Sequence, residues 1–339
     1  MINRRRFIKQ VSVAGMLSSI PAVFLPQQNG LILQQKSTQP KIWACLLHLS
    51  VNMWREYYPD LEFDESLWND ALKKMVDAGM NMVVIDLGDG VRYESHPEIA
   101  VNNAWATTRL HDELAKIRKM GLEPIPKMNF STCHDGWLRE YGRMVSTKQY
   151  YIVCRDLIAE VIDLFDTPRF FHLGMDEENE SNQRDFGMII IRQNELYWGD
   201  LYYLIGEVFK GGSRPWVWQD YIRYYPEQFA RMMPKSVLQS NWYNLTDFDK
   251  PKTNKSVKAY LDLETLGYDQ VPGGSNYYEN TEKCFFNNVK FCYENVADQR
   301  LFGFIQSPWK YTIEENRERI LLSIEQAGEA KKWFDDKHK

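Results

Sequence analysis

One alternation, repeated eight times, constrains the fold of this 339-residue chain more than any other feature. From residue 41 onward, short runs of β-branched and aromatic residues alternate with longer amphipathic stretches, as in parallel strands joined by crossover helices. The expected strands are residues 42–48, 81–87, 122–129, 169–175, 215–221, 237–243, 269–276 and 301–307. The expected helices are residues 66–78, 107–120, 147–165, 187–209, 226–233, 253–266, 281–296 and 314–334. Eight such units predict a closed (β/α)8 TIM barrel of the α/β class.

The barrel is expected to be a single domain spanning residues 41–339, because no linker or low-complexity segment divides the series. Glycine falls at three positions where helices should end, namely Gly79, Gly121 and Gly267. The seventh strand is the weakest element, because it contains Pro272 and two glycines. An open doubly wound sheet is the alternative fold, but residues 48–52 (HLSVN) are not the glycine-rich phosphate turn that such a sheet would carry.

The first 40 residues are expected to be an export signal and linker. Residues 3–9 (NRRRFIK) resemble a twin-arginine signal, which has two arginines followed by any residue, Phe, an aliphatic residue and Lys. The apolar run at residues 11–25 is too short for an ordinary membrane span, so no integral span is expected in the mature form. A disordered basic tail is the alternative. We therefore expect a periplasmic or otherwise exported protein.

Charge and cysteine content argue against several partners. The first 40 residues hold five basic side chains and no acidic one, so their removal changes the formal charge from -5 to -10. A protein that binds phosphate backbones normally carries the opposite balance, and nucleic acid is therefore not expected as a partner. The five cysteines are scattered without a CxxC pair, which predicts buried thiols rather than a disulfide framework or a zinc site. No metal or other cofactor is expected.

Polar and aromatic residues gather at the expected carboxyl ends of the strands, which share one rim in such a barrel. They are His48, Asn52, Trp54, Asp86, Asp89, Asn129, His134, His172, Asp176, Glu177, Glu178, Trp218, Asp220, Trp242, Tyr243, Tyr277, Glu279, Trp309 and Tyr311. Carboxyl groups can transfer protons, and aromatic faces pack against the apolar face of a pyranose ring. The rim therefore predicts a carbohydrate partner. The alternatives are rim packing for the tryptophans, a core role for His48, and a solvated loop or helix cap at residues 176–180.

The fourth strand carries a resemblance to a known family. Residues 171–177 (FHLGMDE) resemble the His-x-Gly-Gly-Asp-Glu segment of glycoside hydrolase family 20, the β-N-acetylhexosaminidases. The resemblance implies that Glu177 is the general acid/base and that Asp176 orients the substrate 2-acetamido group, which acts as the nucleophile. We expect an apolar aromatic surround to raise the pKa of Glu177, and strand alternation to point the two carboxylates in different directions.

Further segments are similar to motifs of this family, in the same order along the barrel. They are residues 129–137 (NFSTCHDGW), 217–220 (VWQD), 239–242 (QSNW), 277–279 (YYE) and 309–311 (WKY). The resemblance implies substrate-binding roles for His134, His172, Trp218, Asp220, Trp242, Tyr277, Glu279 and Trp309. It spans about residues 42–334 and predicts an exported glycoside hydrolase that cleaves terminal sugars.

Two departures from the family pattern leave other functions open. Met175 replaces the second glycine of the segment, and the end of strand 1 lacks the family's sugar-binding arginine, with only Arg55 near it. A non-catalytic carbohydrate-binding relative is therefore one alternative. A metal-dependent barrel hydrolase is another, although strand 1 offers His48 alone where two histidines flanking one residue are usual. The sugar and its linkage stay open.

Replacing both Arg4 and Arg5 with Lys should leave the protein in the cytoplasm, because a twin-arginine signal is read by a receptor and not by hydrophobicity alone. Fractionation of cells that produce the original and the substituted protein measures the difference. A Lys36→Arg variant, which keeps the charge and lies outside the motif, is the control. Unchanged delivery of the double variant would contradict the twin-arginine interpretation.

Overall fold

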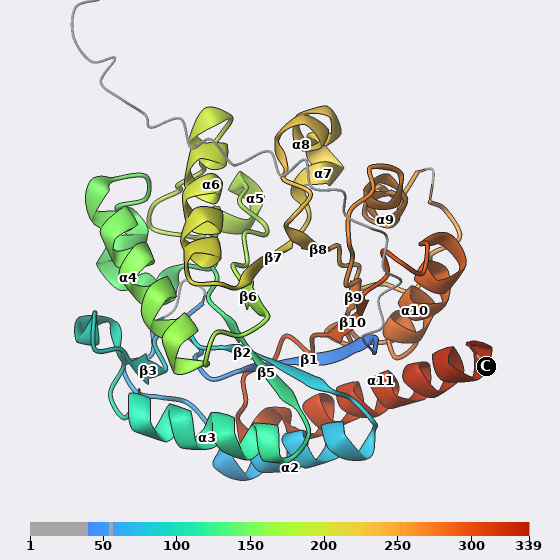
Figure 1. Ribbon diagram of the computed structural model, residues 1–339, viewed down its shortest axis with the longest axis horizontal. Helices are drawn as coiled ribbons and strands as arrows, with labels where there is room; N and C mark the ends of the chain where they lie inside the picture. The colour runs from blue at the N-terminus through green and yellow to red at the C-terminus, as the bar shows by residue number, and fades with distance from the viewer. Residues whose placement is uncertain (1–39, 54–56, 252, 339) are drawn as a thin grey trace, which may run out of the picture. The chain divides into compact units, whose positions relative to one another are not determined.

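In the computed structural model, the described residues are 40–53, 57–251 and 253–338. Within them, eight parallel strands form one sheet in the order β8-β7-β6-β5-β2-β1-β10-β9. The strands are β1 (Ile42–His48), β2 (Met82–Asp86), β5 (Glu123–Lys127), β6 (Phe170–His172), β7 (Arg214–Trp218), β8 (Leu238–Ser240), β9 (Gly273–Gly274) and β10 (Gly303–Gln306). They lie at the centre of the molecule, with helices around them (Figure 1). The twin-arginine pattern expected to be an export signal, Trp54 and Arg55 fall outside the described residues.

The two ends of this sheet meet, so the sheet closes. Gly273 N donates to Asn241 O at 2.8 Å, and Val271 N donates to Gln239 O at 2.9 Å. A parallel bridge also pairs Trp242, just beyond β8, with Gly273 of β9. These contacts join the first and last strands of the order, and the predicted (β/α)8 barrel is confirmed.

The helices follow the strands much as the sequence predicts. They are α2 (Glu65–Asp77), α3 (Thr107–Lys119), α4 (Lys148–Leu164), α5 (Glu180–Gln183), α6 (Glu195–Lys210), α7 (Tyr221–Tyr224), α8 (Pro226–Met232), α9 (Lys255–Thr265), α10 (Cys284–Asn295) and α11 (Arg317–Lys337). The 3-10 helices are η1 (Pro97–Ile99), η2 (Gly136–Arg143) and η3 (Glu314–Asn316). A short parallel pair, β3 (Val91–Arg92) and β4 (Trp105–Ala106), lies outside the barrel. Helices α2 and α11 run side by side, which brings the last helix against the first one of the described residues (Figure 1).

Several strands, among them β6 and β8, are shorter than the sequence predicts, and the short helices α5 and α7 were not predicted. Two further differences have an identifiable physical reason. Helix α6 begins at Glu195 and not at residue 187, because Asn194 adopts a left-handed φ of 51° and interrupts the helical backbone. The preceding turn is held instead by side-chain bonds, such as the one from Ile190 N to Gln183 Oε1 at 2.9 Å. Strand β9 is only two residues long, in keeping with the missing N–H of Pro272 just before it.

Alternation along β1 divides the apolar residues between two cores. Ile42, Ala44 and Leu46 point into the barrel, whereas Trp43 and Cys45 pack in the layer between the strands and the helices. All seven residues of β1 are buried, as expected of a strand covered on both faces. A continuous apolar run therefore supplies both layers from a single strand.

A layer of polar side chains lies near the carboxyl end of the barrel. His48 pairs in register with Asp86, Asp86 with Lys127, and Lys127 with His172, so these residues occupy four neighbouring strands at one level. All four are almost completely buried. Lys127 Nζ donates a hydrogen bond to Asp86 Oδ2, so the two side chains form a buried ion pair. This layer separates the apolar barrel core from the loops above it.

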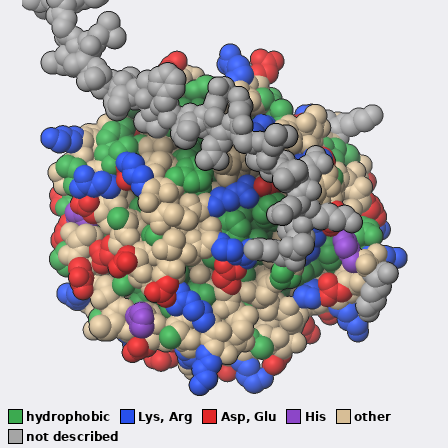
Figure 2. Space-filling view, in the orientation of Figure 1, with side chains coloured by type: hydrophobic (Ala, Val, Ile, Leu, Met, Phe, Trp, Pro, Cys, Tyr) green, Lys and Arg blue, Asp and Glu red, His purple; other side chains and the backbone are tan. Residues whose placement is uncertain are grey.

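Acidic and basic side chains are interspersed over the face shown in Figure 2. None of the helices in the described part of the chain combines the length and apolar character needed to cross a membrane. The five cysteines are buried and unpaired, as the sequence predicts.

Gly303→Ala should destabilise the barrel, because Gly303 has a φ of 149° and an added Cβ would lie 2.0 Å from the carbonyl oxygen of Ile42. The two backbones form the β1–β10 pair and would have to separate, which we expect to cost about 3 kcal/mol or more. Gly121→Ala is the matched control: its φ is also positive, at 86°, but it has open space for a Cβ and should lose only about 1–2 kcal/mol. Denaturation midpoints measure both, and equal losses would contradict the prediction.

Candidate functional site

A cavity of about 1020 Å³ opens among the loops at the carboxyl ends of the strands. Its lining comes from loops that follow β1, β5, β6, β8, β9 and β10. The lining residues are Val51, Met53, Tyr58, Glu62, Lys127, Asn129, His134, Asp176, Glu177, Trp242, Asn244, Tyr277, Tyr278, Trp309, Lys310, Tyr311, Ile313, Glu314, Glu315 and Asn316. The working face expected of a barrel thus holds a hollow large enough for a sugar.

The carboxylate pair lies on a sharply bent turn after β6. Gly174, Met175 and Glu177 all have left-handed φ angles, of 71°, 77° and 62°. The strand ends at His172, so its alternation no longer applies at the two carboxylates. One carboxylate oxygen of Asp176, one of Glu177 and a ring nitrogen of His134 lie within 4.8 Å of one another. The expectation that the carboxylates point in different directions is wrong, because the left-handed residues turn them to one side.

Asn129, from the loop after β5, fastens this turn. Its Nδ2 donates to Asp176 Oδ1 at 2.8 Å, and its Oδ1 accepts from Met175 N at 3.1 Å. A Cβ at Gly174 would lie only 1.9 Å from that same Oδ1. The approach of the amide therefore requires glycine at position 174 and fixes the orientation of the Asp176 carboxylate.

His134 joins the two carboxylates. Its Nε2 lies 3.2 Å from Glu177 Oε2 and 3.6 Å from Asp176 Oδ2. Burial would lower the pKa of His134, but the charge of Asp176 and the bond to Glu177 outweigh burial and raise it. Burial would likewise raise the pKa of Glu177, but the bond and charge of His134, with the charge of Arg223, lower it. The expectation of a raised Glu177 pKa is therefore wrong: its surround is not apolar, since it includes a histidine at hydrogen-bond distance.

Asp220 lies behind the carboxylate pair and does not line the cavity. Its Oδ2 accepts a hydrogen bond from Glu177 N at 2.9 Å, which holds the turn from the side of β7. Burial, together with the charge of Asp176, raises the pKa of Asp220 to about 7, against the opposing charge of Arg223. Asp220 therefore carries a proton for much of the time near neutral pH.

The other residues proposed from the sequence divide between the cavity and its surroundings. Trp242, Trp309 and Tyr277 line the cavity. Trp218 is buried beneath them, with its ring 5.4 Å from that of Trp309. The remaining two lie apart from the lining: His172 is buried in the polar layer with its ring 4.7 Å from Trp218, and Glu279 is exposed to solvent.

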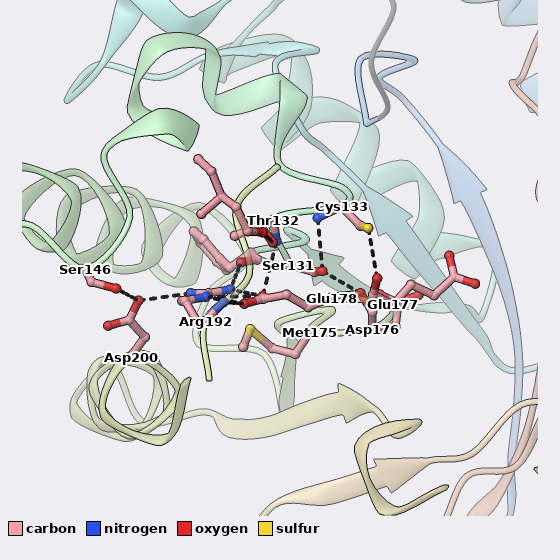
Figure 3. A network of polar contacts seen from close by, with 12 residues as sticks. Ser131, Thr132, Cys133, Ser146, Met175, Asp176, Glu177, Glu178, Arg192 and Asp200 are labelled. Carbon is pink, nitrogen blue, oxygen red and sulfur yellow. Dashed lines mark hydrogen bonds and ion pairs between the residues drawn. The ribbon is translucent and has the colours of Figure 1, made fainter. Parts of the chain in front are cut away.

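The sequence reasoning did not identify two basic residues of the site. Lys127 reaches the cavity from the end of β5, and together with His48 it outweighs burial to lower the pKa of Asp86 to about 2. A lysine near the carboxyl end of a mostly apolar expected strand was the available signal for it. Arg192 lies behind the turn and contacts Glu178 (Figure 3). Its position inside an expected helix concealed it.

His134, Asp176 and Glu177 form the group among the described residues whose geometry could hold a metal ion. One imidazole and two carboxylates could bind a divalent cation. Two of these groups already bond to protein partners, because Asp176 accepts from Asn129 and Glu177 lies at hydrogen-bond distance from His134. The polar atoms of the cluster therefore have partners without a metal ion. The same three side chains could also act in proton transfer and in orienting a ligand.

Comparison with known proteins places this geometry on a familiar scaffold. No family model and no curated sequence matches the chain. Among solved structures, the Flavobacterium johnsoniae chitobiase FjGH20 has a TM-score of 0.58 and 16% identity, covering 83% of this chain and 47% of its own. The Streptomyces plicatus N-acetyl-β-hexosaminidase bound to Thio-NAglucal has a TM-score of 0.60 and 13% identity, and the match covers 85% of this chain and 64% of that one. Dispersin B has a TM-score of 0.57 and 15% identity, and the match covers 86% of this chain and 99% of that one. These likenesses establish the fold, and this chain spans about half the length of the chitobiase.

Asp135→Asn should reduce the pH dependence of stability. Burial and the charge of Glu178 raise the pKa of Asp135 to about 8, although the charges of Arg192 and His134 oppose the rise. Because the folded state holds this proton more tightly than the unfolded chain, the contribution is full below about pH 4 and is lost as the pH rises through 8. We expect the thermal midpoint to fall less between pH 6 and pH 9 in Asp135→Asn than in the original protein. Asp112→Asn, on an exposed side chain, is the control, and an equal fall in all three proteins would refute the prediction.

Proposed function

We propose that the chain is an exported glycoside hydrolase that removes terminal N-acetylated hexosamine units. The observation that carries the proposal is the group formed by Asp176, Glu177 and His134 inside a cavity walled by aromatic rings. The solved structures with the same fold support it, since they include a chitobiase, an N-acetyl-β-hexosaminidase and an exo-β-N-acetylglucosaminidase in complex with N-acetylglucosamine. The residues at the start of the chain support export through their twin-arginine pattern.

In the proposed mechanism, Glu177 protonates the glycosidic oxygen while the bond from that oxygen to the sugar breaks. The Glu177 side chain is 33% exposed and reaches the cavity, whereas that of Asp176 is 7% exposed and is held by Asn129. The raised pKa of His134 and the lowered pKa of Glu177 favour a proton on His134 over one on Glu177 in the free protein, and we propose that this proton is the one donated. It passes to Glu177 across the 3.2 Å contact before it reaches the substrate.

Asp176 is proposed to accept a hydrogen bond from the substrate 2-acetamido N–H. The acetamido oxygen then attacks the anomeric carbon as the leaving group departs, and water opens the resulting ring with Glu177 as the base. Asp176 is suited to this task, because Asn129 fixes one of its oxygens and the other lies on the side of the cavity near His134. Orientation of a group costs the enzyme least when the orienting side chain is already held.

The aromatic wall is proposed to bind the sugar ring. Trp242 and Trp309 present rings to the cavity, and the guanidinium of Arg223 lies 4.3 Å from the Trp242 ring, which fixes its plane. Trp242 Nε1 is buried without a hydrogen-bond partner in the described structure. Because this N–H is out of contact with solvent, the proposed contact with the sugar is made by the face of the Trp242 ring.

Glu177→Gln should lower turnover of a natural N-acetylhexosaminide about 10²- to 10⁴-fold while sugar binding persists, because glutamine keeps the shape but cannot donate the proton. Aryl glycosides, whose leaving groups need little protonation, should lose less. Asp176→Asn should be harmful chiefly on substrates that bear a 2-acetamido group. Steady-state kinetics on acetamido and plain aryl glycosides, with calorimetric binding of N-acetylglucosamine, measure these effects.

Glu325→Gln is the matched control, because this exposed carboxylate of α11 pairs with Lys74 of α2, does not line the cavity, and should leave turnover unchanged. Equal losses of Asp176→Asn on both substrate types would refute substrate-assisted catalysis. Binding of N-acetylglucosamine without turnover by the original protein would favour the non-catalytic carbohydrate-binding alternative. Loss of turnover in a chelator, restored by zinc, would favour the metal-dependent alternative, which the cluster of His134, Asp176 and Glu177 allows.

A further inference from the structure

A buried arginine stands behind the carboxylate turn. Arg192 Nη2 donates to Glu178 Oε2 at 2.6 Å, and Arg192 Nε donates to Glu178 Oε1 at 2.9 Å. The exposed fractions of these side chains are 1% and 4%. The pair is therefore a forked ion pair removed from water, and Glu178 directly follows Glu177 in the chain.

The same guanidinium also holds the segment that carries His134. Arg192 Nη2 donates to Phe130 O at 2.7 Å, and Thr132 N donates to Glu178 Oε2 at 3.3 Å. Two further bonds join the segments directly, from Ser131 Oγ to Asp176 O at 2.5 Å and from Cys133 Sγ to Glu177 O. The loop after β5 and the turn after β6 thus meet at one ion pair (Figure 3).

Helix α6 anchors the arginine from the other side. Arg192 Nη1 lies 3.1 Å from Asp200 Oδ2, and Asp200 is fully buried. Asp200 also accepts hydrogen bonds from Ser146 Oγ, at 2.7 Å, and from the Tyr151 hydroxyl of α4. Figure 3 shows Arg192 between Glu178 and Asp200, so the guanidinium connects the turn to the helical layer.

Stability alone is a weak reason for such an arrangement. Desolvation of buried ion pairs often offsets their attraction, and apolar replacements of similar volume can be neutral. What the guanidinium provides is geometry, since its donors point in fixed directions toward Glu178, Asp200 and Phe130. The backbone that it restrains includes Glu177, whose left-handed φ of 62° is costly and needs surrounding contacts to persist.

We infer that Arg192 is a positioning residue that fixes the carboxylate of Glu177 relative to His134 by restraining the backbone on both sides of that contact. The inference rests on the proposed function for its catalytic consequence. Loss of the guanidinium frees Glu178 and relaxes the turn, so the 3.2 Å contact between Glu177 Oε2 and His134 Nε2 is no longer maintained. The ring contacts that the described residues show for Trp242 and Trp309 are with Arg223, His48 and Trp218 and not with this network, so the proposed sugar-binding wall should keep its shape.

The test compares Arg192→Lys and Arg192→Ala with a matched ion-pair variant, Arg300→Lys. Arg300 pairs with Glu264 near the amino ends of the strands, away from the cavity. For Arg192→Lys, kcat on an N-acetylhexosaminide should fall about 10²-fold with KM changed less than about threefold, since misplacement of about 1 Å costs this much. Added guanidinium ion should restore at least about tenfold of the loss in Arg192→Ala, while methylammonium should not. Arg300→Lys should keep kcat whatever it does to the thermal midpoint.

A second readout is independent of turnover. Hydrogen exchange of the amides in residues 130–134 and 174–178 should accelerate in Arg192→Lys and stay unchanged in Arg300→Lys. Glu178→Gln, which keeps the shape and an acceptor oxygen, is the second variant and should show the same local acceleration more weakly, even where an Arg192 variant fails to fold. If the original protein hydrolyses no glycoside, the proposed function is wrong. The hydrogen-exchange measurement still tests whether Arg192 restrains the two segments. Unchanged exchange in these two segments, or an equal fall of kcat in Arg192→Lys and Arg300→Lys, would overturn the inference.

Discussion

The geometry of the site depends on the amide of Asn129. One side chain accepts from the backbone of the turn after β6 and donates to the carboxylate that the turn carries, so both are fixed together. The same amide also accepts from Ser131 N at 3.1 Å, which ties its own loop to the contact. Because the amide approaches Gly174 so closely, a residue with a Cβ there would push the turn away. Two loops, far apart in the sequence, thereby act as one unit.

The barrel could be predicted because its local and global requirements agree. Each long strand is buried on both faces, so its sequence is a continuous apolar run, and each helix between two strands has one apolar stripe. Prediction was weakest where tertiary contacts replace local patterns. Strand β9 has two residues and is positioned by its neighbours on both sides, whereas the start of α6 is set by the backbone of Asn194. Neither feature has a periodic signal in the sequence.

The site was predictable in its members and less so in its geometry. Residues at strand ends must share a rim once the barrel is closed, which is why Asp176, Glu177, His134, Trp242 and Trp309 are found around one cavity. Their relative orientation, however, depends on three left-handed residues, and periodicity does not describe such backbone. The left-handed φ of 77° at Met175, for example, could not be predicted from composition or from the pattern of apolar residues. The network behind the turn was also hidden, since an arginine followed by a helical pattern is ordinarily a surface residue.

Burial and basic neighbours reduce the negative charge of several carboxyl groups near the site, which suits a neutral sugar. The carboxyl groups with little access to water, Asp135 and Asp220, have pKa values raised to about 8 and about 7, so protons reduce their charge near neutral pH. Glu177, which reaches the cavity, is balanced instead by His134, and Asp86 beneath it is balanced by Lys127. A proton or a basic partner thus reduces the negative charge of each of these four carboxyl groups. The raised pKa of His134 and the lowered pKa of Glu177 favour a charged pair at the contact where the proposed chemistry needs a proton.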